Sequence, residues 1–116
     1  MFYQINDDIE TMIGLRKEFR KSQGTFRQIF KDDRIVVYQV SNRYENGATA
    51  IWYEIFKPKV HQPNAYHYDE YEKYPSDEDF GKWAWCCSTP KSVEKILKKC
   101  FEDVNPSEIM PNLQWH

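Results

Sequence analysis

The stretch from Tyr74 to Trp85, YPSDEDFGKWAW, organises the chain around it, because a helical turn and a strand adjoin within it. The hydroxyl of Ser76 can accept a backbone N–H of the turn that follows, and the acidic residues 77–79 suit the positive end of a helix. Gly81 then interrupts helical geometry. We therefore predict one capped helical turn from Ser76 to Phe80.

The end of this stretch has the alternation of a strand, which is predicted from Lys82 onward. The alternation places Trp83 and Trp85 on one face of that strand. Ala84 and Cys86 then lie on the other face. The pattern is informative about folding and carries no chemistry of its own.

The length and composition of the chain favour one domain. With 116 residues and 41% hydrophobic content the chain can bury a modest core, so we expect residues 1–116 to form a single domain. An aromatic content of 16% is typical of a folded protein rather than a disordered one. A net charge of −2 and an isoelectric point near 5.9 argue against a general polyanion-binding protein, which would carry a basic excess.

The apolar segments and the cysteines bear on the cellular compartment. No apolar run approaches about eighteen residues and no charged-then-apolar leader follows Met1, so we expect neither a membrane span nor a cleaved secretory signal. The cysteines are three in number, and Cys86 and Cys87 are adjacent, which does not suit a disulfide framework. Adjacent strand residues face opposite sides, so at most one of this pair lies in the core. We expect a cytosolic protein.

The N-terminal residues predict a helix followed by a first strand. Asn6 and the acids after it can cap a helix that extends to about Lys21, and Gly24 suits its C-terminal end. Residues Thr25 to Lys31 favour a strand. Their alternation is imperfect, so a helix stays open as an alternative there.

The middle of the chain predicts a hairpin. Arg34 to Ser41 is rich in β-branched residues, and the pair Asn46-Gly47 favours the positive φ angles of a tight turn. Ala48 to Lys57 should therefore return antiparallel to the first strand. Both faces of the returning strand carry large apolar side chains, which is typical of a central strand that is covered on both sides.

The C-terminal half predicts an edge strand and a helix. Residues Tyr66 to Tyr74 alternate tyrosines with charged residues, as a charged edge strand does. Thr89 and Pro90 suit the start of a helix, and the apolar spacing from Val93 to Val104 gives that helix one apolar face.

Together these elements predict an α+β fold, in which an antiparallel sheet of three to five strands carries an N-terminal and a C-terminal helix. We expect the apolar face of the C-terminal helix to contact Trp52 or Trp83. Residues 105–116 are predicted to form an ordered C-terminal tail that docks on the body or on a neighbouring molecule.

The sequence contains none of the common catalytic or cofactor motifs that we sought: no glycine-rich phosphate loop, G-x-S-x-G, C-x-x-C or H-E-x-x-H. We therefore predict no cofactor and no metal. His61, His67 and Asp69 have the chemistry of metal ligands but no compact spacing, and solvated side chains explain them better. A nucleophile at Cys86 or Cys87 would need a nearby base, which the sequence does not place.

A small enzyme is the third of three functions that the sequence leaves open. The acids 77–79 beside Tyr74 and Trp83 could include a carboxyl group with a raised pKa, because apolar neighbours disfavour its charged form. The plainer interpretation is that these acids charge the start of a helical turn.

The leading hypothesis is a small non-enzymatic protein that binds another protein through an acidic, tyrosine-rich surface. Residues 69–79 hold six acids against one lysine, and tyrosine gives large, rigid contacts that neighbouring charges can orient. An edge strand protected by charge is the plainer interpretation. The surface is compatible with a homo-oligomer, and no membrane partner is expected. The predicted contact residues are Tyr66, Tyr68, Asp69, Glu70, Tyr71, Glu72, Tyr74, Asp77 and Asp79.

The alternative hypothesis is a nucleic-acid-binding module in the basic part of the chain. Residues 16–34 hold seven basic groups against three acidic ones, and Phe26 and Phe30 could stack on bases. The acidic residues 69–79 would repel phosphates unless they face away. The residues predicted to bind nucleic acid are Arg16, Arg20, Arg27, Lys31 and Arg34.

At two motifs, WYEIF at Trp52–Phe56 and YPSDEDFGKWAW at Tyr74–Trp85, the chain resembles small uncharacterised proteins of bacterial phages and mobile elements. The resemblance covers roughly residues 34–100. It implies a protein made in the cytoplasm of a bacterial host cell, where it would engage or inhibit host or viral machinery. It transfers no catalytic residue.

Overall fold

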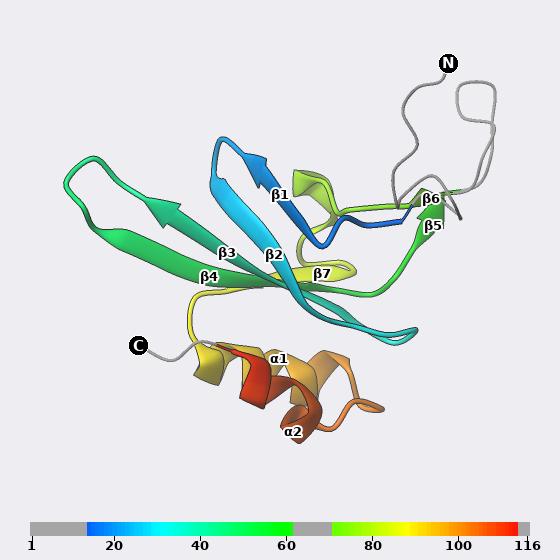
Figure 1. Cartoon of the computed structure of the whole chain (residues 1–116). Coiled ribbons are helices and arrows are strands. Elements are labelled where there is room, and N and C mark those ends of the chain that lie inside the picture. Colours follow the sequence, from blue (N-terminus) through cyan, green and yellow to red (C-terminus); the bar gives the residue numbers. More distant parts are fainter. Residues whose placement is uncertain (1–13, 62–70, 114–116) are drawn as a thin grey trace, which may run out of the picture.

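The protein is built on a five-stranded antiparallel sheet (Figure 1). The computed structural model describes residues 14–61 and 71–113. The strands follow the order β1-β2-β3-β4-β7 across the sheet, so each of the first four lies beside its neighbour in sequence. The predicted α+β class and antiparallel sheet are confirmed. The strands are β1 (Glu18–Lys21), β2 (Gly24–Lys31), β3 (Val36–Arg43), β4 (Thr49–Phe56) and β7 (Ala84–Cys87).

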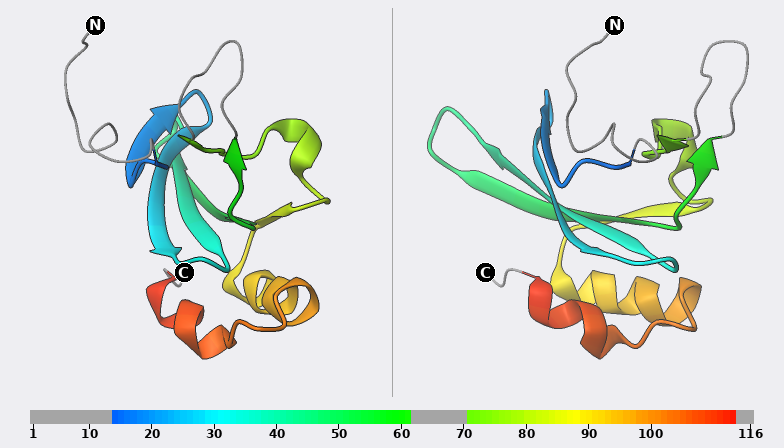
Figure 2. Two further views of the ribbon diagram at one scale, coloured as in Figure 1. Left: turned by 90° about the vertical axis from the view of Figure 1, so that its right-hand side faces the viewer. Right: turned by 45° about the vertical axis from the view of Figure 1, so that its right-hand side comes forward.

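The other described elements lie on the two sides of this sheet. Helices α1 and α2 lie on one side, which we call the helix side, and the β5–β6 pair and the η1 turn lie on the opposite side, which we call the far side (Figures 1 and 2). Within the described ranges, no helix combines the length and the apolar character needed to cross a membrane. These elements are β5 (Val60–His61), β6 (Tyr71–Glu72), η1 (Asp77–Asp79), α1 (Pro90–Cys100), α2 (Pro106–Ile109) and η2 (Met110–Asn112).

The predicted N-terminal helix is wrong for the part of it that the structure describes. Glu18–Lys21 form strand β1, and residues 6–13 of the predicted helix lie outside the described residues. In β1 the ring of Phe19 stacks on Phe26 of β2, with 4.8 Å between the ring centroids, and meets Tyr74 edge to face. Such tertiary contacts outweigh the modest helix propensity of the segment.

Gly24 begins strand β2 after a tight turn and does not end a helix. Its φ of 148° suits glycine, and a Cβ at this position would come within 2.3 Å of the backbone oxygen of Ser41. The hairpin of β1 and β2 can therefore lie this close to β3 only with glycine there.

The predicted hairpin in the middle of the chain is confirmed. Strands β3 and β4 pair antiparallel from Val36 opposite Phe56 to Arg43 opposite Thr49. Gly47 has a φ of 89°, as the tight turn requires.

The strand predicted at residues 25–31 is also confirmed, as β2. The register with β3 shifts between Gln28 and Phe30. As a result Phe26 points to the far side while Phe30 packs on the helix side. This bulge explains the imperfect alternation of the sequence.

Each side of the sheet carries its own buried core. The helix-side core joins Tyr53 of β4 to Leu97 of α1, and the far-side core joins Tyr38 of β3 to Phe56 of β4. None of these four side chains is more than 1% exposed. Strand β4 is therefore covered on both sides, as its two apolar faces predicted.

Helix α1 begins as predicted and packs on a different partner from the predicted one. The hydroxyl of Thr89 accepts the backbone N–H of Ser92 at 3.1 Å, with Pro90 in the first turn. Leu97 is buried in the helix-side core, whereas Trp52 and Trp83 belong to the far side. The expected contact of the helix with either tryptophan is therefore wrong.

Trp83 and Trp85 do not share a face. Strand β7 begins only at Ala84, so Trp83 lies in the preceding turn and packs in the far-side core against Phe56. Trp85 points to the helix side and meets Phe101 edge to face at 5.4 Å. The alternation predicted a strand that starts before the real one.

The predicted helical turn after Tyr74 is present, but its cap differs from the predicted one. Asp77–Asp79 form η1, and the Ser76 hydroxyl donates to Asp79 Oδ2 instead of accepting a backbone N–H of the turn. In the predicted C-terminal tail, α2 and η2 place Ile109 and Leu113 in the helix-side core, so the tail docks on its own chain as far as residue 113. Residues 114–116 lie outside the described residues.

The predicted edge strand is described only in its second part. Tyr71–Glu72 form β6, which pairs with β5 in a separate small sheet, and Tyr74 lies beyond that strand. Residues 66–70 of the prediction lie outside the described residues.

Candidate functional site

A polar cluster on the far side of the sheet centres on Glu54 of β4. The Tyr74 hydroxyl donates to Glu54 Oε1 at 2.7 Å, and the Trp52 indole N–H donates to Oε2 at 3.2 Å. Burial, and next the negative charge of Glu54, raise the pKa of Tyr74. Tyr74 is therefore a permanent donor that fixes the position of the carboxylate.

Of the two adjacent cysteines, Cys86 lies beside this cluster and Cys87 lies in the helix-side core, and neither thiol is activated there. Cys86 is exposed and lies directly opposite Glu54 in the β4–β7 register. Desolvation and then the charge of Glu54 raise the pKa of Cys86, and burial raises the pKa of Cys87 to about 11. Because the thiolate is the nucleophile, this environment disfavours cysteine chemistry. Cys87 is buried, which confirms that only one of the pair lies in the core.

The predicted protein-contact residues are only partly described. Tyr66, Tyr68, Asp69 and Glu70 lie outside the described residues. Among the rest, Tyr71 and Glu72 are half-buried in β6 and Tyr74 belongs to the far-side core. These three predicted residues therefore lie close together.

Glu72 and Asp79 have partners within the fold. Glu72 Oε2 is 2.7 Å from the Lys31 amine, and Glu72 Oε1 accepts the backbone N–H of Leu15. Asp79 accepts the backbone N–H and the hydroxyl of Ser76, at 2.9 and 3.0 Å.

One of the acids 77–79 was a candidate for a raised pKa, but the pKa of Asp79 is lowered and not raised. The backbone N–H of Ser76 is the main cause that lowers the pKa of Asp79. Asp77 is exposed, and no ion pair joins it to the described part of the chain. The turn therefore presents charge to solvent, as its plainer interpretation held.

The five residues predicted to bind nucleic acid do not gather on one surface. Lys31 pairs with Glu72 on the far side, and Arg34 is bound to the C-terminal segment. Arg16 is exposed ahead of β1, while Arg20 and Arg27 are exposed on the helix side. Phe26 and Phe30, the expected stacking rings, pack into the two cores instead.

Arg34 joins the turn between β2 and β3 to α2. Its Nη2 lies 2.6 Å from Asp32 Oδ2 and 2.8 Å from Glu108 Oε1, and its Nη1 donates to the backbone oxygen of Asp103. The Arg34 hydrogen bond lowers the pKa of Glu108. Burial alone would raise the pKa of Asp32, but hydrogen bonds from Arg34 and nearby backbone N–H groups hold it below its usual value. This cluster supports the fold.

A third arginine completes a set that the sequence did not reveal. Arg43 near the end of β3 is exposed, and the strand registers place it on the same side of the sheet as Arg20 and Arg27. We call this surface the arginine face; its residues are Arg20, Arg27, Arg43, Thr25, Ser41, Thr49 and the acid Glu18, which lies opposite Arg27. Counting residues outward from the Asn-Gly turn could have placed Arg43 here.

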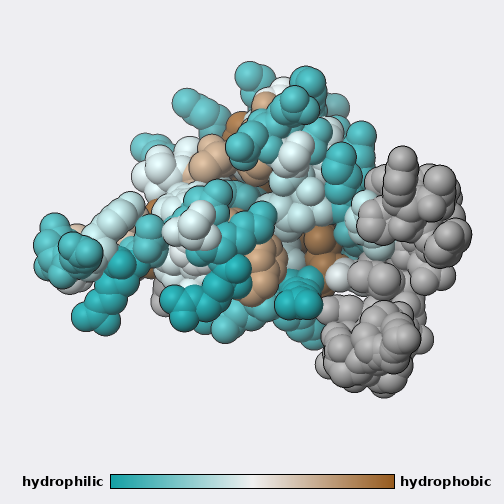
Figure 3. Space-filling model, turned by 90° about the horizontal axis from the view of Figure 1, so that it is seen from above, coloured by the Kyte–Doolittle hydropathy of each residue, from teal (hydrophilic) through white to brown (hydrophobic). Residues whose placement is uncertain are grey.

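The end of the β3–β4 hairpin projects beyond the helices (Figure 1). Its turn residue Tyr44 is 51% exposed. Figure 3 looks onto the far side and shows this end as a hydrophilic projection, with apolar surface elsewhere as separate patches. The projecting end belongs to neither core.

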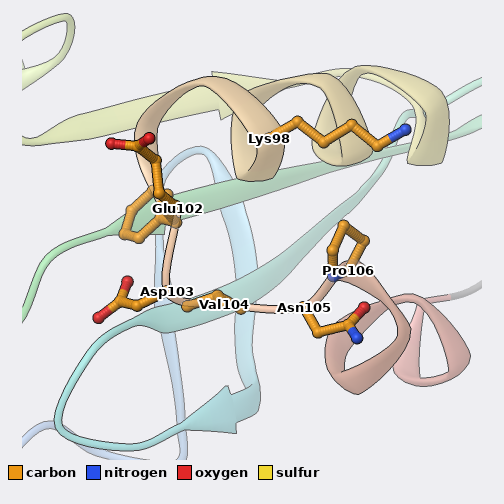
Figure 4. Close-up of a pocket in the computed structure, with 7 residues that line it drawn as sticks. Lys98, Glu102, Asp103, Val104, Asn105 and Pro106 are labelled. Carbon is orange, nitrogen blue, oxygen red and sulfur yellow. The ribbon is translucent and has the colours of Figure 1, made fainter.

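A hollow of about 520 Å³ lies where α1 turns into α2 (Figure 4). Its lining includes the buried residues Phe101 and Val104 and the exposed charged residues Lys98, Glu102 and Asp103. In Figure 4 the amine of Lys98 points away from the two carboxylates, so the charged groups do not converge on one point. The hollow lacks the converging polar groups of a small-molecule site.

Within residues 14–61 and 71–113, no three histidine, cysteine or acidic side chains gather as ligands for a metal ion. His67 and Asp69 lie outside these ranges. No protein-family model, curated protein or solved structure matches this chain.

Proposed function

We propose that this chain is a small non-enzymatic protein that acts in the cytoplasm by binding another protein. The observation that carries the proposal is the projecting end of the β3–β4 hairpin, where Tyr44 is 51% exposed. A half-exposed tyrosine on a paired strand end offers a rigid contact at low entropic cost. Neither core needs this end for its packing.

The acidic, tyrosine-rich segment from Tyr66 to Asp79 is a second proposed contact. In its described part, Tyr74, Glu72 and Asp79 already have partners within the fold, so the proposed contact there is smaller than the predicted one. Asp77 is exposed at the η1 turn. The resemblance of residues 34–100 to small phage and mobile-element proteins supports a partner from host or viral machinery.

Co-purification from a native bacterial lysate tests the proposal. The tagged protein should retain one partner in stoichiometric amount, identified by mass spectrometry. Tyr44→Ala should reduce that partner at least about tenfold, the loss typical of an interface residue that contributes above ~1.4 kcal/mol. Lys95→Ala, an exposed change on α1, is the matched control and should keep the partner.

Two outcomes would count against the proposal. One is a wild-type protein that retains no stoichiometric partner. The other is a partner that Tyr44→Ala and the double variant Tyr68→Ala, Glu70→Ala both retain in full. Melting temperatures of all variants must stay within a few degrees of wild type, so that a lost partner reports on the contact and not on unfolding.

A further inference from the structure

The strand registers bring three arginines from three strands to one side of the sheet. Arg27 of β2 lies opposite Glu18 of β1, so Arg20 is its diagonal neighbour, at about 7–8 Å between Cα atoms. Arg20 lies opposite Thr25, which in turn lies opposite Ser41 of β3. Arg43 follows two residues after Ser41 on the same face, roughly 12 Å from Arg20 by strand spacing and rise.

The approach of the two hairpins is built into the backbone. Gly24 lies so close to the backbone oxygen of Ser41 that only glycine fits, which fixes the end of β1 and β2 beside β3. The hydroxyls of Thr25 and Ser41 therefore stand between Arg20 and Arg43. Both hydroxyl side chains are half-buried, whereas the three arginines are exposed.

The positive charge of the arginine face is not neutralised by the described residues. None of the ion pairs within residues 14–61 and 71–113 involves Arg20, Arg27 or Arg43. By contrast, Lys31 and Arg34 each have a carboxylate within 3 Å. Among the described strand residues of this face Glu18 is the single acid, and it lies opposite Arg27, so an excess of positive charge remains on them.

The chemistry of the face fits carboxylates better than nucleic acid. Guanidinium groups bind carboxylates through paired hydrogen bonds, and the neighbouring hydroxyls can add single ones. Single-stranded nucleic acid also needs exposed rings for its bases, but Phe26 and Phe30 are packed in the cores.

We propose that the arginine face binds an acidic segment of a partner protein, with Arg20, Arg27 and Arg43 contacting its carboxylates. This inference rests on the proposed function and adds the chemistry of the partner. In the projecting hairpin Arg43 is the last residue of β3 and Tyr44 follows it in the turn, so one partner can contact both.

Fluorescence anisotropy with labelled poly-L-glutamate tests the face directly. The triple variant Arg20→Gln, Arg27→Gln, Arg43→Gln should bind the probe at least about tenfold more weakly, since losing even one charge-assisted contact of ~1.4 kcal/mol has that effect. The control Lys91→Gln, Lys95→Gln, Lys99→Gln makes the same change in net charge on exposed positions of α1. It should bind like wild type.

The single variant Arg43→Gln lies at the hairpin end, outside both cores, so it should leave folding unchanged. It should also weaken the binding of poly-L-glutamate. Equal binding by wild type and the arginine variants would overturn the inference, as would an equal loss in the lysine control. A labelled oligothymidylate that binds more tightly than poly-L-glutamate, through the same arginines, would assign the face to nucleic acid instead.

The lysate experiment separates this inference from the proposed function. A stoichiometric partner that the triple arginine variant retains in full would overturn the arginine face and leave the proposed function standing. A wild-type protein without any partner would count against the proposed function, and the probe comparison would still decide the chemistry of the face.

Discussion

Leu97→Ala tests how helix α1 is seated on the sheet. Leu97 is 0% exposed in the helix-side core, where Tyr53 and Ile109 are also buried. The change removes three carbon atoms, which at about 0.8 kcal/mol each gives roughly 2.4 kcal/mol of lost transfer free energy. The cavity left behind adds to this, so we expect a total loss of about 2.5 to 5 kcal/mol.

That loss is large for a chain of this size. At about 0.05 to 0.15 kcal/mol per residue, 116 residues correspond to roughly 6 to 17 kcal/mol of unfolding free energy. The melting temperature should therefore fall by about 10 °C or more. Urea unfolding followed by tryptophan fluorescence measures the change, and an unaltered m-value would show that the unfolded state is unaffected.

Two control variants make the result specific. Leu97→Met nearly conserves volume and should cost less than about 1.5 kcal/mol. Lys95→Ala, exposed on the same helix, should change stability by less than about 0.5 kcal/mol. A loss below about 0.5 kcal/mol for Leu97→Ala, or a loss as large for Lys95→Ala, would refute the assigned face of α1.

The remaining predictions concern backbone, charge, thiols and the far-side cluster. Gly24→Ala should lower the unfolding free energy by about 1 to 3 kcal/mol, because it forces a strained φ and a contact with the backbone of β3; a neutral result in urea unfolding would contradict the close approach. The pKa of Glu108 is lowered in the folded protein, so as the pH falls the unfolded state takes up the proton first. The contribution of Glu108 to the unfolding free energy is therefore fully present above its ordinary pKa of 4.5 and is lost as the pH drops below that value. Arg34→Met should flatten that acid limb in melts from pH 7 to 3, and an unchanged pH profile would argue against the ion pair. Cys86 should react with a thiol reagent at pH 7 more slowly than free cysteine, and reducing agent should leave the melting temperature unchanged; faster reaction, or a drop of several degrees on reduction, would contradict this. Tyr74→Phe should cost about 1.5 to 3 kcal/mol in urea unfolding, the range for a hydrogen bond to a charged group, and a neutral result would argue against the bond to Glu54.

Local signals were enough to predict the elements that depend on a few neighbouring residues. The Asn-Gly turn before β4 and the Thr89-Pro90 start of α1 are encoded by backbone and capping preferences within a few residues. The η1 turn behind Ser76 belongs to the same class. In each case the physical cause is short-range, so the sequence pattern contains it.

The failures arose where contacts distant in sequence decide the structure. Phe19 is drawn into a strand by Phe26 and Tyr74, and helical capping signals cannot report that contact. Alternation wrongly predicts Trp83 and Trp85 on one face, because it does not reveal that the strand begins only at Ala84.

The candidate site could be predicted only in part. The basic pattern predicted Arg20 and Arg27 in one set with Lys31 and Arg34. In the fold, Lys31 and Arg34 form ion pairs with carboxylates elsewhere. The pairing of Arg34 with Glu108 spans 74 residues and leaves no local pattern. Arg43 was within reach, since the register of the β3–β4 hairpin follows from its turn.

The division of the interior between two sides of the sheet has a consequence during synthesis on the ribosome. The described members of the far-side core span residues 15–84, whereas the helix-side core draws on residues up to Leu113. The growing chain can thus form the far-side core while the helix side of the same strands is still exposed to solvent. Until α1 and α2 emerge, Tyr53 and Ile55 remain available to chaperones or to a neighbouring nascent chain.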